Sequence, residues 1–127
     1  MSVVTLEQLI ARKNQSDQDR MKVMEVESDE LGGTIMAKKL PLEKFFDISD
    51  MSGETSEEAY RANCMLIYQS CDIFHNKELI EAYGCKEPYE VVTKIFHDNV
   101  CEVRTIADKI MKLYGYGKEK QGEHLKN

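Results

Sequence analysis

From Thr55 onward, apolar residues recur at every third or fourth position, a spacing that is typical of helices burying one face. Thr55 and Glu58 have the spacing of a capping box at the start of the longest such segment. Gly84 and Gly115 stand where two further segments end, as glycines that stop helices do. The positions predicted to face the core are Tyr60, Cys64, Ile67, Tyr68, Cys71, Tyr89, Val92, Ile95, Phe96, Val103, Ile106, Ile110 and Leu113. The pattern therefore predicts a helical domain.

The N-terminal segment predicts a helix of a different kind. Thr5 and Gln8 again have capping-box spacing. Only a narrow apolar stripe follows, formed by Leu6, Leu9 and Ile10, and residues 14–20 are entirely polar. We expect a first helix that is weakly anchored to the core, and that is either mobile or docked on a partner.

Two short β-prone runs surround Gly32-Gly33 and predict a hairpin at about residues 21–40. A two-stranded hairpin is marginal in water, so it must pack on the helices or pair with something else. Pro41 then suits the first turn of the next helix.

The fold expected from these segments is mostly α (α+β), a single helical domain with a small N-terminal hairpin. The domain covers residues 1–117, with the helices after the hairpin at about 41–114. Residues 118–127 are polar and have no apolar stripe, so they are expected to form a flexible tail.

Charge and hydropathy restrict the classes of partner. The chain has 127 residues, with 17 Lys and Arg against 23 Asp and Glu, and its net charge of −6 repels phosphate backbones. Nucleic acid is therefore not expected as a partner. The longest apolar runs are far shorter than a membrane span, and the N-terminus has no signal-peptide pattern. We expect no membrane contact and a cytoplasmic location.

The sequence has no motif of a phosphate-binding loop, a dinucleotide fold, a zinc protease or a serine hydrolase. We predict no enzymatic activity, no cofactor and no metal site. The cysteines Cys64, Cys71, Cys85 and Cys101 contain no C-x-x-C pair, and we interpret them as small buried hydrophobes. Two alternatives remain open, a metal site that includes His75 or His97 and a Cys71–His75 nucleophile pair.

The predicted hairpin is also the predicted partner-binding region. Its apolar residues lie close to a sheet edge, and strand edges and methionines both favour association. These candidates are Met21, Val23, Met24, Ile35 and Met36. We expect them to contact another protein or a second copy of this chain.

Several segments together resemble the phage tail assembly chaperones of Gram-positive phages, prophages and phage-tail-like particles. The segments run from Leu6-Glu7-Gln8-Leu9-Ile10-Ala11-Arg12-Lys13 through Leu31-Gly32-Gly33-Thr34-Ile35 and Lys39-Leu40-Pro41-Leu42. They continue with Leu66-Ile67-Tyr68-Gln69-Ser70-Cys71, Asn76-Lys77-Glu78-Leu79, Glu81-Ala82-Tyr83-Gly84-Cys85, Glu87-Pro88-Tyr89-Glu90-Val91-Val92-Thr93-Lys94 and Leu113-Tyr114-Gly115. Residues 51–62 depart from the family's pattern.

The resemblance implies a non-catalytic protein that binds the tape-measure protein and keeps it soluble while tail-tube subunits polymerise. It also implies contact with the tail-tube protein, a location in the bacterial host cytoplasm, and absence from the mature particle. The alternative reading is a small cytosolic adaptor or inhibitor module without catalytic activity.

Overall fold

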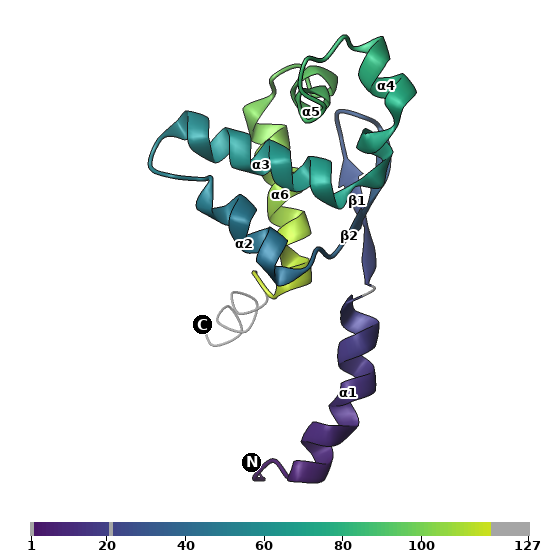
Figure 1. The fold of residues 1–127 in the computed structure, drawn as a ribbon, viewed down its shortest axis with the longest axis vertical. Helices are drawn as coiled ribbons and strands as arrows, with labels where there is room; N and C mark the ends of the chain where they lie inside the picture. Colours follow the sequence, from purple (N-terminus) through teal and green to yellow (C-terminus); the bar gives the residue numbers. More distant parts are fainter. Residues whose placement is uncertain (1, 21, 118–127) are drawn as a thin grey trace.

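The computed structural model describes residues 2–20 and 22–117, and Figure 1 shows a helical body with a two-stranded sheet at its side. The elements are α1 (Leu6–Arg20), β1 (Val23–Ser28), β2 (Gly33–Lys38), α2 (Leu42–Asp50), α3 (Ser56–Ser70), the 3-10 turn η1 (Asp72–His75), α4 (Lys77–Ala82), α5 (Glu90–Ile95), α6 (Val100–Met111) and the 3-10 turn η2 (Lys112–Tyr114). The predicted fold class, mostly α with a small N-terminal hairpin, is confirmed. The predicted tail at 118–127 lies outside the described residues.

The core forms where α3 crosses α6, with α5 closing one end of the crossing (Figure 1). Side chains from all three helices are fully enclosed there, among them Ile67, Val92, Phe96, Ile106 and Ile110. Burying each large apolar side chain contributes roughly 1.5–3 kcal/mol before entropy is subtracted. This crossing therefore holds most of the hydrophobic stabilisation of the body.

Side-chain caps begin α3, α4 and α6, and the Thr55–Glu58 box at the start of α3 was predicted from the sequence. In α3 the Thr55 hydroxyl accepts from the Glu58 backbone N–H at 3.1 Å, while the Glu58 carboxylate accepts from the Thr55 N–H at 3.2 Å. The Thr55 hydroxyl also donates to the Glu58 carboxylate at 2.8 Å, and this bond, together with the one from the Thr55 N–H, holds the pKa of the Glu58 carboxyl below its usual value. Asn76 and Asn99 cap α4 and α6 through their side-chain oxygens. The glycines also act as predicted, since Gly84 and Gly115 adopt positive φ at their helix ends.

The hairpin pairs β1 with β2 in an antiparallel register in which Val26 lies opposite Ile35 and Glu25 lies opposite Met36. Alternate residues point to opposite faces. Val26, Ile35 and Ala37 turn inward and join the core, whereas their neighbours in the strands are exposed. The hairpin thus reaches stability by packing on the helices, as expected for an isolated pair of strands.

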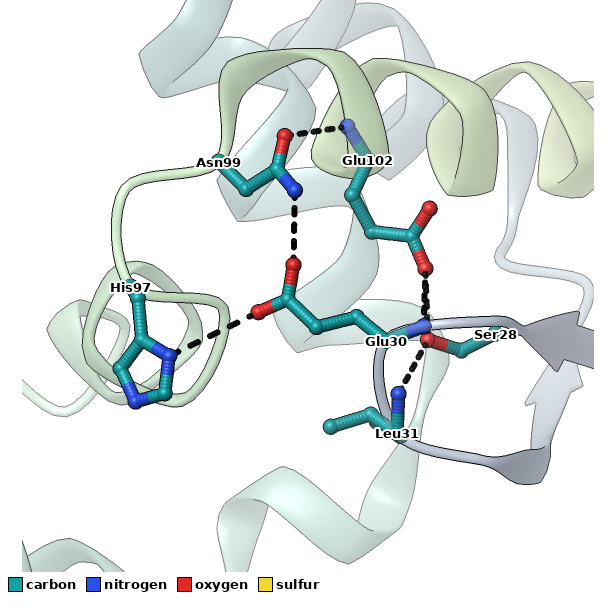
Figure 2. A network of polar contacts seen from close by, with 6 residues as sticks. All are labelled: Ser28, Glu30, Leu31, His97, Asn99 and Glu102. Carbon is teal, nitrogen blue, oxygen red and sulfur yellow. Dashed lines mark hydrogen bonds and ion pairs between the residues drawn. The ribbon is translucent and has the colours of Figure 1, made fainter.

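A polar network fixes the hairpin turn to the start of α6 (Figure 2). The buried Ser28 hydroxyl donates to the Glu102 carboxylate at 2.7 Å and accepts from the Leu31 N–H at 3.2 Å. The Glu30 carboxylate accepts from the Asn99 side-chain amide at 2.7 Å, and the Glu30 N–H donates to Glu102 at 3.3 Å. These bonds join the turn to the cap of α6, so the network positions the hairpin rigidly on the body.

Helix α1 projects from the body as an arm, drawn in purple in Figure 1. Every side chain from Ser2 to Gln18 is exposed. At the base of the arm, the Lys22 N–H donates to the Asp19 carbonyl at 3.1 Å and Lys39 forms an ion pair with the Asp19 carboxylate. The expected weakly anchored first helix, including its Thr5–Gln8 capping box, is confirmed.

Candidate protein-binding surfaces

The cysteines divide into two groups. Cys64 and Cys71 are enclosed in the core, as the sequence predicted, but Cys85 is half-buried and Cys101 is exposed. Burial raises the pKa of the Cys64 thiol to about 11 and that of Cys71 to about 12. Both thiols are therefore protonated near neutral pH, where a nucleophile or metal ligand would have to be a thiolate.

His75 does not serve Cys71 as a base. Helix α3 ends at Ser70, and the chain then enters the η1 turn, so the helical i, i+4 spacing between Cys71 and His75 is lost. The His75 ring nitrogen Nε2 lies 2.6 Å from the Tyr68 carbonyl oxygen and must donate its proton there. Across residues 2–20 and 22–117, no cluster of three or more His, Cys, Asp or Glu side chains could hold a metal ion. No helix in the same part of the chain is long and apolar enough to cross a membrane.

The predicted partner-binding residues are distributed over both faces of the hairpin. Val23 and Met36 lie on the outer face and are 56% and 51% exposed. Ile35 is only 8% exposed and Met24 is half-buried, so these two contribute to the inner face. Met21 lies outside the described residues. The outer face of the hairpin is thus defined here by Val23, Glu25, Glu27, Thr34, Met36 and Lys38.

The backbone N–H and C=O groups of the outer-face residues point away from the partner strand. A hydrogen bond from the Lys39 N–H to the Lys22 carbonyl marks this pair as hydrogen-bonded, and such pairs alternate along an antiparallel ladder. Glu25 and Met36 therefore form a non-hydrogen-bonded pair whose N–H and C=O groups face the two sheet edges. The Lys109 ammonium group donates to the Glu27 carbonyl at 3.1 Å and closes one end of the β1 edge.

Two further apolar surfaces lie outside the hairpin. The arm tip consists of Val3, Val4, Leu6, Leu9 and Ile10, all of which are more than half exposed. The aromatic pocket consists of Leu42, Phe45, Phe46, Tyr114 and Tyr116, at the end of the body where α2 meets η2. Exposed apolar groups gathered in this way make both surfaces candidates for binding another protein.

The weakly anchored arm was predicted from the sequence, whereas the aromatic pocket was not. Leu42, Phe45, Phe46 and Ile48 have helical spacing and read as one buried face. In the structure Phe45 and Ile48 are buried, whereas Leu42 and Phe46 are 55% and 54% exposed. The available signal was the width of the stripe, since four large apolar residues in a helix of nine span more than one neighbour can cover.

Comparison with known families identifies the class of protein to which this chain belongs. The family model described as "Phage XkdN-like tail assembly chaperone protein" matches residues 35–126. This match covers more than half of the chain, which therefore belongs to the XkdN-like phage tail assembly chaperone family. Searches of curated proteins and of solved structures gave no match.

The family membership confirms the resemblance predicted from the sequence and implies protein partners in tail assembly. It indicates a role in assembly rather than in catalysis. The matched range begins at Ile35, so α1 and β1 precede it.

Proposed function

We propose that this chain binds the tape-measure protein of its phage or phage-tail-like particle, keeps it soluble, and yields it as tail-tube subunits polymerise. The observation that carries the proposal is the outer face of the hairpin, where Val23 and Met36 stay exposed although the inner face packs on the helices. A tape-measure protein that has not yet been assembled exposes long apolar stretches that aggregate. Covering such stretches with an acidic partner would contribute net charge to the complex.

The outer face suits a client that must later be released. Val23 and Met36 are diagonal neighbours across the two strands, close enough to form one small apolar contact area. Glu25 and Glu27 surround them, so the contact area is interrupted by charge. Moderate contacts of this kind dissociate readily, because differences in affinity appear mainly in the off-rate. We place this activity in the bacterial host cytoplasm and expect no copy in the mature particle.

Co-expression with the tape-measure protein tests the proposal. We expect the wild-type chain to raise the soluble fraction of the tape-measure protein and to elute with it. The double variant Val23→Asp/Met36→Asp should lose this effect while keeping its far-UV circular dichroism spectrum, since both side chains are exposed. The matched control is Ile73→Asp/Val100→Asp, which changes two similarly exposed aliphatic residues elsewhere on the body.

The contrary result is equally clear. If the wild-type chain leaves the soluble fraction unchanged and no complex elutes, the adaptor or inhibitor reading replaces the chaperone proposal. If the control variant lost the solubilising effect to the same extent, the loss would result from added surface charge in general and not from changes to the hairpin face.

A further inference from the structure

The arm tip and the aromatic pocket are two apolar surfaces of one molecule, and neither is covered within the described residues. Ile10, at the inner boundary of the tip, is 64% exposed. In the pocket the rings of Phe45 and Tyr114 stack at a centroid distance of 4.0 Å and form a rigid floor. Leu42, Phe46 and Tyr116 also line this open pocket of about 440 Å³. This space suits aliphatic side chains such as those of the tip.

Helix α2 and the η2 turn, which line the pocket, lie nearer to the base of the arm than to its tip (Figure 1). Lys39 connects the arm and the pocket, because its ammonium group pairs with Asp19 of the arm and lies 5.8 Å from the centre of the Tyr114 ring. Within a helix, Ile10 and Leu6 lie about 15 Å and about 21 Å along the axis from Arg20. While α1 remains helical, the arm tip therefore cannot reach the pocket of its own chain.

The net charges beside the two surfaces have opposite sign, because Arg12 and Lys13 outnumber Glu7 near the arm tip while Glu43 and Asp47 outnumber Lys44 in α2. Arg12 and Lys13 follow the arm tip directly in α1, where both are exposed. In α2, Glu43 and Asp47 each follow an exposed residue of the pocket, and both are exposed as well. A tip seated in a pocket would bring the two basic residues close to the two acidic ones. Such complementarity favours this pairing over a pairing of two tips.

From these features we propose that the arm tip of one copy docks in the aromatic pocket of a second copy, and that the contact is reciprocal. In each copy, the tip lies at the far end of the arm and the pocket lies on the body near the base of the arm. Two arms lying antiparallel therefore place each tip at the pocket of the other copy. A two-fold axis between the arms satisfies both contacts at once and closes the assembly as a dimer.

Sedimentation velocity on the full chain alone tests this inference, without any tape-measure protein. We expect the wild-type chain to form a dimer. The variant Leu9→Asp/Ile10→Asp should raise the dissociation constant by more than about a hundredfold, because two apolar anchors of each contact become charged. Ile73→Asp changes a similarly exposed aliphatic residue in η1, outside the arm tip and the pocket, and should leave the dimer intact. A wild-type chain that stays monomeric would overturn the inference.

Mixing two broken variants distinguishes tip-to-pocket contact from tip-to-tip contact. Phe46→Asp should also be monomeric, since it charges the pocket. Mixed with Leu9→Asp/Ile10→Asp, it should form a heterodimer, because one intact arm then meets one intact pocket. If the contact joined two tips instead, Phe46→Asp would stay dimeric and the mixture would contain no heterodimer.

Charge reversal gives a second, independent readout. Arg12→Glu/Lys13→Glu should weaken the dimer, and Glu43→Lys/Asp47→Lys in the same chain should restore it. Failure of this rescue, with both variants folded by circular dichroism, would contradict the proposed register. If the arm variants stay dimeric but no longer elute with the tape-measure protein, the arm binds the client and the inference is wrong.

Discussion

At the scale of single residues, burial decides what the reactive side chains can do. Cys64 and Cys71 are among the most enclosed residues of the body, at 1% and 0% exposed, and their thiols fill space in the core. Cys101 has the same chemistry but stands on the surface of α6. The three cysteines therefore provide an internal comparison of buried and exposed thiols.

We predict that Cys64→Ala and Cys71→Ala each lower the free energy of unfolding by about 1 kcal/mol, because each deletes a small buried group. Cys101→Ala is the control and should change it by less than about 0.5 kcal/mol. Urea denaturation at neutral pH measures all three. A loss of partner binding in a Cys64 or Cys71 variant that is still folded would instead indicate a functional thiol.

The raised pKa values of these thiols also predict a dependence of stability on pH. An acid whose pKa is higher in the folded state stabilises that state below the unfolded pKa, and the contribution is lost as pH rises. The window runs from the ordinary value of 9.0 to about 11 for Cys64 and about 12 for Cys71. The wild-type chain should therefore lose stability more steeply above pH 9 than Cys64→Ala/Cys71→Ala does. Parallel curves of the free energy of unfolding against pH would contradict this.

At the scale of elements, two capping boxes of the same geometry begin helices with different surroundings. The Thr55–Glu58 box begins α3, which crosses the core, and the Thr5–Gln8 box begins the exposed arm. A cap contributes to global stability only when its helix unfolds together with the body. The two threonines therefore form a matched pair for measuring how the arm is coupled to the rest.

We predict that Thr55→Ala lowers the free energy of unfolding by about 1 kcal/mol, the usual cost of losing an N-cap. Thr5→Ala should leave the unfolding midpoint unchanged and reduce only the helical circular dichroism signal of α1. Chemical denaturation followed at a near-ultraviolet and a far-ultraviolet wavelength separates these effects. A lower midpoint for Thr5→Ala would show that the arm unfolds with the core.

The elements also show how far sequence reasoning reaches. Capping pairs and apolar spacing are local, so they located α3, α4, α6 and the hairpin. The inner face of the hairpin was not predictable, because Val23 and Val26 are three residues apart and cannot share one face of a strand. The bond between Ser28 and Glu102 joins residues 74 positions apart, and no spacing rule reports it. The aromatic pocket was missed for the same reason, since its floor joins α2 to η2.

At the scale of the whole molecule, the chain consists of a packed body and an arm that contributes almost nothing to the core. The first fully buried side chain along the described chain is Val26, well after the end of α1. The ion pair between Asp19 and Lys39 connects the base of the arm to the body, and its Asp19 carboxylate is half exposed. Partly exposed pairs of this kind contribute about 0–1 kcal/mol.

Removal of residues 1–20 should therefore leave the body folded. At protein concentrations at which the full chain is monomeric, we predict an unfolding free energy within about 1 kcal/mol of the full chain, the expected value of the lost ion pair. The far-ultraviolet signal should fall by the contribution of the 15 helical residues of α1. Thermal and urea denaturation of both chains measure this. A truncated chain that aggregates or melts much earlier would show that the arm stabilises the body.

The projecting arm has a consequence for how a long client would be held. If two copies join through their arms as proposed, they would present two hairpin faces to one client chain, and the second contact would form at a high local concentration. Weak individual contacts then add up to firm retention by avidity. Retention of this kind is sensitive to competition from one end, because displacing one face returns its neighbour to single, weak binding. A client would leave progressively along its length, in step with whatever grows over it.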